Sequence, residues 1–252
     1  MKRLKVLAAC LLVSSASQAA VMVTGDVQNP GPIPLPAGGR LVDVIGEAVP
    51  NAESYWLGAF LLRKSLLEPQ TRLKTGVLFD LQVLQRTALL FDLPSRAALA
   101  VRLTEQVSAM PVTGRQVTVL DPVAIEVGFA LNVRLDDGDQ LIYPKRVDEV
   151  QVVGAVADTC HLPYHVGQEA SEYLDDCEQL PDAEADYLWL IQPDGSVRRV
   201  GNAAWNRESG HVPAAGSKIM VPVKNDDLDP PIPELNQQLA EFIATQLAEV
   251  VH

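Results

Sequence analysis

Two cysteines and two histidines that lie close together in the sequence could form a disulfide or a metal site. Cys160 and Cys177 are 17 positions apart, and His161 and His165 follow the first of them. A disulfide that closes a loop of this size contributes about 3 kcal/mol to folding in the chain-entropy model. A zinc site would need both imidazoles on one helix face, which Pro163 opposes because it interrupts a regular helix. The spacing therefore predicts a disulfide and no bound metal, with zinc as the alternative.

Arg115 is the residue whose position best suits ligand binding. It follows a glycine at the point where a predicted helical insert returns to a sheet. A guanidinium there can point into the crevice between insert and sheet and hold carboxylates or sugar hydroxyls. The structural alternative is an Arg that closes a helix C-terminus or pairs with one of the many acids. Tyr55, Trp56 and Trp205 are further candidates, because aromatic rings can stack on sugars, whereas Trp189 alternates within an apolar strand and is expected in the core.

The sequence contains none of the common local motifs of catalysis. A nucleophile elbow, a phosphate-binding loop, a dinucleotide fingerprint and a zinc-protease helix are all absent. The acidic segment 136–139 lacks the ligand spacing and the closing Glu of an EF-hand, and it is typical of a hairpin turn. The sequence therefore predicts no catalytic residue and no cofactor.

The composition describes an acidic globular chain. Its 252 residues suit two modest domains, and 48% of them are hydrophobic. Asp and Glu number 32 against 20 Lys and Arg, which gives a net charge of -12. Such a surface repels phosphate backbones, so the composition argues against nucleic acid as a partner.

The N-terminus resembles a secretory signal peptide. A basic start, an apolar run over 6–13 and small residues over 14–20 predict cleavage after Ala19 or Ala20. The apolar run is too short to span a bilayer, and no later segment predicts a transmembrane helix. Lipidation at Cys10 is the weaker alternative, because it would leave almost no apolar region. Cleavage removes three basic and no acidic residues, so the net charge falls from -12 to -15.

An internal repeat organises the remaining chain. Residues 21–27 and 150–156 are both alternating apolar strands interrupted by glycine, and residues 138–144 match 216–222 as a turn, a strand and a closing proline. Each unit thus opens and closes with the same pattern, which predicts two copies of one β-rich domain.

Helical spacing interrupts the first copy. Apolar residues recur at helical intervals over about 70–110, which predicts an inserted helical hairpin. Before it, residues 55–67 are predicted as strand. After it, the β-branched runs 117–120 and 123–127 predict a β-hairpin. In the second copy, 187–200 predicts a further hairpin around a Pro-Asp-Gly turn.

The chain ends in a predicted amphipathic helix that begins after Pro233. Its apolar face, the candidate partner-binding surface, comprises Leu235, Leu239, Phe242, Ile243, Leu247 and Val250. Lys and Arg are missing from its polar face, which disfavours a membrane surface. Amphipathic helices usually pack on their own domain, but the Asp- and Pro-rich linker 226–233 would let this one reach the groove of a partner. The sequence leaves both arrangements open.

Several of these segments resemble a known family. The run Val-Thr-Gly-Asp-Val-Gln-Asn-Pro-Gly at 23–31, the apolar segment 41–45 and the closing strand at 138–144 resemble the soluble-ligand-binding β-grasp domains of bacterial polysaccharide export proteins. Together with the hairpin insert, residues 111–115 and the terminal helix, the chain over about 21–251 resembles the group 4 capsule biosynthesis protein C family.

The resemblance implies an α+β fold, mainly β, with two tandem β-grasp domains. The expected segments are a signal peptide over 1–20, a first domain over 21–149 with its insert at about 70–110, a second domain over 150–225, a linker over 226–233 and an amphipathic helix over 234–252.

The resemblance also implies a periplasmic accessory protein of capsule or exopolysaccharide assembly or export. It would bind the polysaccharide or the outer-membrane polysaccharide export protein. The alternatives are a glycan-modifying enzyme with a cleft near Arg115, and a structural partner that docks through its C-terminal helix. Because the chain is acidic, contact with an anionic glycan is expected only at a local basic spot such as the Arg115 crevice.

Overall fold

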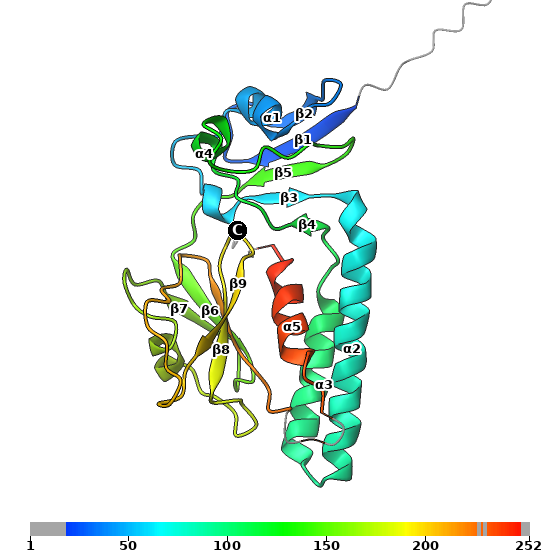
Figure 1. Cartoon of the computed structure of the whole chain (residues 1–252), viewed down its shortest axis with the longest axis vertical. Coiled ribbons are helices and arrows are strands. Elements are labelled where there is room, and N and C mark those ends of the chain that lie inside the picture. Colours follow the sequence, from blue (N-terminus) through cyan, green and yellow to red (C-terminus); the bar gives the residue numbers. More distant parts are fainter. Residues whose placement is uncertain (1–18, 226–227, 229–230, 248–252) are drawn as a thin grey trace, which may run out of the picture.

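The computed structural model describes residues 19–225, 228 and 231–247. Most of the expected signal peptide, including Cys10, lies outside the described residues, as does Val250 of the expected terminal helix. None of the described helices is long and apolar enough to cross a membrane. Figure 1 shows two sheets, one above the other, with helices along one side of the lower sheet.

Each domain contains one five-stranded sheet. The first sheet comprises β1 (Ala20–Gly25), β2 (Gly31–Pro34), β3 (Phe60–Leu62), β4 (Arg115–Gln116) and β5 (Gln140–Tyr143), in the order β2-β1-β5-β3-β4. The second comprises β6 (Glu149–Gly154), β7 (Cys160–Pro163), β8 (Tyr187–Ile191), β9 (Val197–Gly201) and β10 (Lys218–Val221), in the order β7-β6-β10-β8-β9. The two orders correspond strand for strand, and the expected α+β fold with two tandem sheets is confirmed.

The repeated glycines explain why both units open in the same way. In each sheet the first strand pairs in parallel with the last, β1 with β5 and β6 with β10. Gly25 and Gly154 end the first strands with φ of 96° and 98°. A Cβ at Gly25 would lie 2.0 Å from the carbonyl oxygen of Tyr143, and one at Gly154 would lie 2.3 Å from that of Val221. Only glycine allows this close approach with a positive φ.

Helices surround the two sheets unequally. They are α1 (Leu41–Ala48), α2 (Leu67–Leu90), α3 (Pro94–Ala109), α4 (Pro122–Glu126) and α5 (Leu235–Ala244), with short 3₁₀ turns at Trp56–Gly58, Lys64–Leu66 and Glu172–Asp176. Helix α1 buries its apolar face in the core of the first domain. Helices α2 and α3 confirm the predicted hairpin insert.

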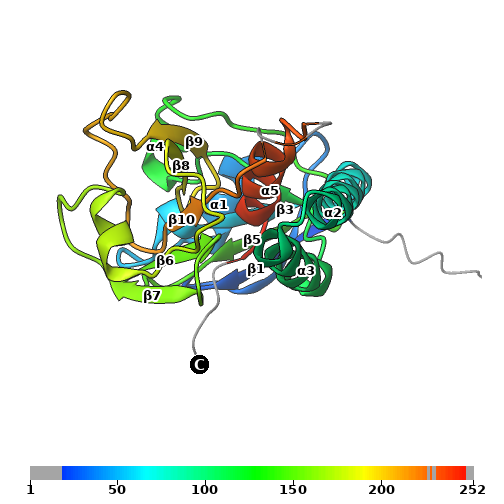
Figure 2. The same cartoon turned by 90° about the horizontal axis from the view of Figure 1, so that it is seen from below.

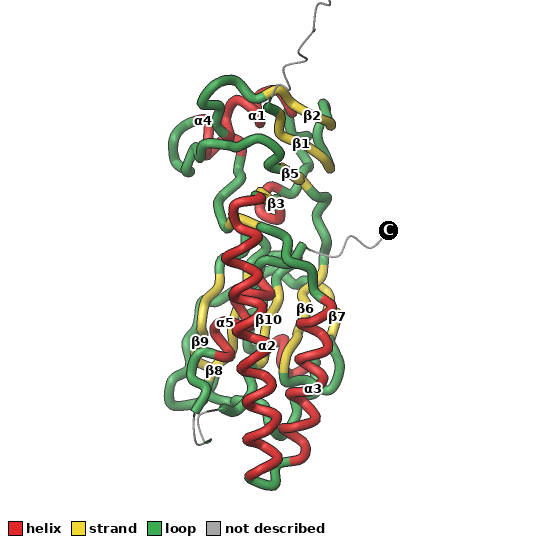
Figure 3. The backbone as a smooth tube through the Cα atoms, turned by 90° about the vertical axis from the view of Figure 1, so that its right-hand side faces the viewer, coloured by secondary structure: helices red, strands yellow, loops and turns green. Residues whose placement is uncertain are grey.

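The hairpin leaves the first domain and packs on the second (Figure 3). Val77 and Leu84 of α2 and Leu103 of α3 are buried in one core with the second sheet and α5. The guanidinium of Arg102 donates to backbone carbonyls of the second domain, including that of Ala157 at 2.6 Å. The insert of one domain thus completes the core of the other.

Helix α5 lies between the hairpin and the second sheet (Figure 2). Leu235, Leu239, Phe242 and Ile243 are at most 5% exposed, whereas Leu247 is 36% exposed. The four buried side chains contact the chain's own core and are not available to a partner in this arrangement. The apolar stripe is therefore explained by packing within the chain, which was the other arrangement the sequence left open.

The β-hairpin predicted over 117–127 is wrong. Strand β4 ends at Gln116, and Pro122–Glu126 is a short helix. The side chain of Asp121 caps this helix, because its Oδ1 accepts from the backbone N–H groups of Val123 at 2.9 Å and Ala124 at 3.3 Å. The helix buries Ile125 in the first core, so capping and burial outweigh the β propensity of the valines.

The structure also tests the predicted hairpin over 187–200, the predicted strand over 55–67 and the predicted disulfide. The hairpin over 187–200 is confirmed as β8 and β9, with Gly195 in the turn at φ 87°. The strand expected over 55–67 shrinks to β3, flanked by two 3₁₀ turns. The predicted disulfide between Cys160 and Cys177 is confirmed, and it joins β7 to the end of the turn Glu172–Asp176.

Candidate functional site

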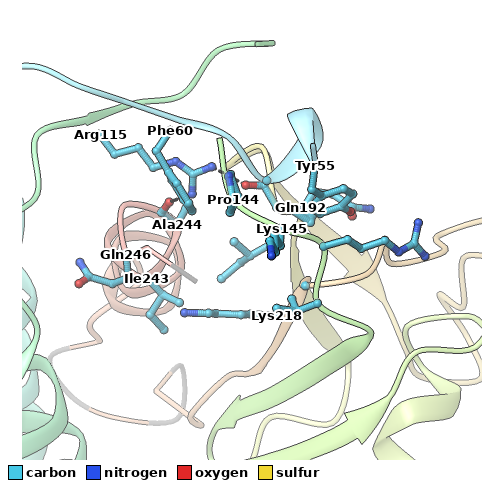
Figure 4. Close-up of a pocket in the computed structure, with 16 residues that line it drawn as sticks. Tyr55, Phe60, Arg115, Pro144, Lys145, Gln192, Lys218, Ile243, Ala244 and Gln246 are labelled. Carbon is cyan, nitrogen blue, oxygen red and sulfur yellow. Dashed lines mark hydrogen bonds between the residues drawn. The ribbon is translucent and has the colours of Figure 1, made fainter. Parts of the chain in front are cut away.

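A cleft of about 300 Å³ lies where the two domains and the end of α5 meet (Figure 4). We call it the interdomain cleft. Its lining residues are Tyr55, Gly58, Phe60, Arg115, Pro144, Lys145, Arg146, Val147, Ile191, Gln192, Pro193, Gly216, Lys218, Ile243, Ala244 and Gln246. The cleft is open to solvent at residues such as Lys145, which is exposed.

The cleft is basic although the chain is acidic. Its lining carries the cations Arg115, Lys145, Arg146 and Lys218, and none of the described lining residues is Asp or Glu. Figure 4 shows Lys218 reaching across the cleft towards Ile243 of α5. The carboxylate of Asp148 lies 2.8 Å from Nε of Arg146 and offsets part of the charge of that residue. In a chain of net charge -12, this is a local concentration of positive charge.

The ends of strands position these side chains. Lys145 and Arg146 lie in the connection that leaves β5 and leads to β6, which is also the crossing between the domains. Lys218 begins β10, and Gln192 stands in the β8–β9 turn. The side-chain carbonyl of Gln192 accepts from the N–H of Ala214 at 2.9 Å, which fixes this turn against the segment that leads into β10. The cleft is therefore lined by residues of both sheets.

Arg115 is buried at the base of this junction, with 4% exposure. Its guanidinium donates to the carbonyl oxygen of Ala244 at 2.9 Å and to that of Pro193, and its Cζ lies 4.3 Å from the ring centroid of Phe60. Ala244 is the last residue of α5, whose terminal carbonyls lack partners within the helix. Arg115 thus closes a helix C-terminus, as the structural alternative supposed, while it also lines the cleft.

Burial changes the protonation chemistry of Arg115. Desolvation lowers its pKa to about 10, partly opposed by the charge of Asp194. The residue is still charged at neutral pH. Its two hydrogen bonds reach neutral carbonyls, and its buried Nε has no partner among the described residues. The site therefore holds a cation whose charge those hydrogen bonds do not neutralise.

Tyr55 joins the first domain to the second. Its hydroxyl donates to the carbonyl oxygen of Ala215 at 2.7 Å, and the guanidinium of Arg146 lies 5.7 Å from its ring centroid. Burial raises the pKa of Tyr55 to about 12, against the opposing charge of Arg146. The phenol therefore stays neutral and can accept a hydrogen bond from a ligand hydroxyl.

The structure brings together only part of the predicted ligand-binding set. Arg115 and Tyr55 both line the interdomain cleft, whereas Trp56, 39% exposed, and Trp205, 77% exposed, are not among the lining residues. Sequence reasoning missed Lys145 and Lys218. Lys145 follows the closing proline of the first unit and Lys218 begins the closing strand of the second, so the repeat pattern contained a positional signal for both.

Comparison with known proteins identifies the family. The capsule biosynthesis GfcC N-terminal model matches residues 17–145, and the capsule biosynthesis GfcC C-terminal model matches residues 158–248. The chain belongs to the capsule biosynthesis GfcC family. A relative, the uncharacterized protein YjbG of Escherichia coli (strain K12), is 29% identical over 184 residues, which cover 72% of each chain.

Family membership supports a role of this GfcC chain in capsule assembly and confirms the resemblance noted in the sequence. Most of the cleft lining lies in one or the other of the two matched parts. Arg115 and Lys145 belong to the part that the N-terminal GfcC model matches, and Lys218 belongs to the part that the C-terminal model matches. A ligand in the cleft would thus contact both parts at once.

Proposed function

We propose that the protein is a periplasmic accessory of capsule assembly or export that binds acidic polysaccharide in the interdomain cleft. The observation that carries the proposal is the charge of the lining, which gathers Arg115, Lys145, Arg146 and Lys218 without an Asp or Glu among its described residues. Membership of the GfcC family supplies the biological context, because both of its matched models are named for capsule biosynthesis.

The physics favours local rather than extended contact with the glycan. A chain of net charge -12 repels a polyanion over most of its surface. A basic cleft with low-dielectric walls focuses the field and attracts the acidic groups of one or a few sugars. The attraction should weaken as salt rises, because the Debye length falls from about 30 Å at 0.01 M to about 8 Å at 0.15 M.

The same lining offers little support for the glycan-modifying alternative. General acid–base catalysis of glycoside cleavage uses a pair of carboxyl groups around the scissile bond. The described residues that line the cleft include no Asp, Glu or His, and Tyr55 stays protonated at neutral pH. We therefore propose binding rather than turnover at this site.

We expect any contact with the outer-membrane export protein to use surfaces other than the apolar stripe of α5. Phe242 and Leu239 are buried beneath the hairpin, so docking through them would require α5 to leave its own core. An accessory that holds the glycan needs no such rearrangement.

Binding of a defined acidic glycan tests the proposal. Polygalacturonate serves as the acidic probe and dextran as the uncharged control, both titrated into the purified chain at low salt. The double variant Lys145→Glu and Lys218→Glu should weaken polygalacturonate binding about tenfold or more, equivalent to about 1.4 kcal/mol. Arg198→Glu makes the same kind of charge change at an exposed position of β9 outside the cleft, and it should have little effect. Equal binding of dextran, or an equal effect of the Arg198 variant, would contradict the proposal.

The cellular part of the proposal has its own test. Deletion of the gene should reduce surface polysaccharide, and the wild-type gene should restore it while the Lys145→Glu and Lys218→Glu form should not. Cell fractionation should recover the protein with periplasmic markers. Unchanged surface polysaccharide after deletion would refute the assigned role.

A further inference from the structure

A second hollow lies beside the interdomain cleft, between the end of α3, strand β6 and α5. Its volume is about 550 Å³. We call it the apolar pocket. Its lining residues are Leu103, Gln106, Val107, Ala109, Met110, Pro111, Gln151, Val153, Gly154, Thr159, His161, Lys218, Leu239, Ile243, Gln246 and Leu247. Lys218, Ile243 and Gln246 also line the interdomain cleft, so the two hollows are adjacent.

The walls of the apolar pocket are largely hydrocarbon. Leu103 and Val107 come from α3, Leu239 and Ile243 from α5, and Val153 from β6. These side chains belong to or pack against the core beneath the hairpin, which holds them in place. Predominantly apolar walls with a few polar groups are typical of sites that bury an apolar ligand or an apolar part of one.

The interdomain cleft and the apolar pocket together form one combined hollow, and its two ends differ in charge. Among its described lining residues, the apolar pocket has Lys218 as its single Lys or Arg, on the side that it shares with the cleft. Beyond Lys218 the cleft adds Arg115 and Lys145. One end therefore favours hydrocarbon and the other favours an anion, with Lys218 at the junction.

We propose that the combined hollow binds an anionic amphiphile, with its hydrocarbon chain in the apolar pocket and its phosphate or carboxylate head at Lys218. This complementarity in charge and polarity selects the occupant. The assignment deepens the proposed function and rests on it for the natural ligand, which would be the lipid end of a lipid-linked acidic glycan. The acidic sugars would then extend into the interdomain cleft.

Calorimetric titration with dodecyl phosphate below its micelle concentration tests the proposal on the full chain. We expect saturable binding of one molecule, with a negative heat-capacity change from apolar burial. Decyl phosphate should bind more weakly, by about fourfold for each methylene removed, which corresponds to about 0.8 kcal/mol. Dodecanol, which lacks the charge, and inorganic phosphate, which lacks the chain, should each bind at least tenfold more weakly.

Variants locate the binding. Gln106 is exposed on α3 and lines the apolar pocket, so Gln106→Trp should obstruct it and weaken dodecyl phosphate binding at least tenfold. Glu105→Trp places the same bulk on the neighbouring exposed position, which does not line the pocket, and it should bind normally. Lys218→Met keeps an apolar stem but removes the charge, so it should reduce the preference for dodecyl phosphate over dodecanol.

The outcomes separate this inference from the proposed function. Absence of saturable dodecyl phosphate binding, or equal binding by the Gln106 and Glu105 variants, would overturn the amphiphile site. Binding by a chain that ends at Leu247 but not by the full chain would show that the terminal residues fill the pocket, and would also overturn it. Polygalacturonate binding by the unsubstituted protein tests the interdomain cleft alone. Dodecyl phosphate binding can therefore fail while polygalacturonate binding succeeds, and the reverse.

Discussion

Arg96 and Asp182 form a buried ion pair that joins the inserted hairpin to the second domain. The Nε of Arg96, on α3, lies 3.1 Å from Oδ1 of Asp182, and the two side chains are 5% and 10% exposed. The hydroxyl of Ser95 donates to the other carboxylate oxygen of Asp182 at 2.6 Å. The hairpin has its sequence origin in the first domain, so this pair is one of the contacts that tie the domains together.

Removal of the Asp182 carboxylate should destabilise the fold strongly, and a variant that keeps a hydrogen-bond acceptor at this position should lose less. Asp182→Ala removes the acidic partner from a buried ion pair, and loss of one member of such a pair costs about 3–5 kcal/mol. Domains of this kind unfold with about 5–15 kcal/mol, so the loss would be a large fraction of the total. Asp182→Asn removes the charge but keeps an oxygen that can accept from Nε of Arg96, so we expect a smaller loss than for Asp182→Ala.

Urea denaturation followed by circular dichroism measures these differences. An exposed ion pair on the same hairpin provides the control, because Arg72 and Glu68 are 78% and 75% exposed. Glu68→Ala should cost at most about 0.5 kcal/mol. A loss below about 1 kcal/mol for Asp182→Ala would refute the reasoning. So would an Asp182→Asn variant that is as unstable as Asp182→Ala, since it would show that the retained acceptor contributes nothing to stability.

Three further predictions concern other parts of the chain. Joint replacement of Cys160 and Cys177 by serine should lower the free energy of unfolding in urea by about 3 kcal/mol, and chemical reduction of the wild type should do the same. The phenol of Tyr55 should ionise near pH 12, which the absorbance difference between wild type and Tyr55→Phe measures, and a midpoint near pH 10 would contradict the burial of the phenol. The neutral phenol's contribution to folding stability is complete below pH 10 and is lost as the pH rises towards 12. Asp121→Ala should lower the free energy of unfolding by about 0.5–2 kcal/mol, whereas Asp121→Asn should retain the cap of α4.

Patterns of local origin predicted much of the secondary structure. The repeated glycines marked Gly25 and Gly154, because a positive φ and a close carbonyl leave no room for a side chain. Helical periodicity likewise located α2 and α3. In these cases the local conformation is determined within one segment and the strand or helix next to it.

Elsewhere two local signals competed, and the sequence did not decide between them. The valines around Asp121 favour strand, but an Asp followed by Pro also starts a helix, and burial of Ile125 in the first core selected the helix. For Arg115, too, the sequence did not decide between two roles. Its type suggested either a ligand or a helix end, and the structure places its guanidinium on the last carbonyl of α5 and on the wall of the cleft.

By itself the sequence determined two β-rich units, a helical insert, a disulfide, an acidic balance and the resemblance to a capsule family. The tertiary structure decided which domain the insert covers, what α5 packs against and where the basic residues gather. Periodicity shows that a helix has a buried face, but it does not show which surface buries that face. Lys145 and Lys218 come from separate units, so a basic cleft appeared only when the hairpin and α5 held the two domains together.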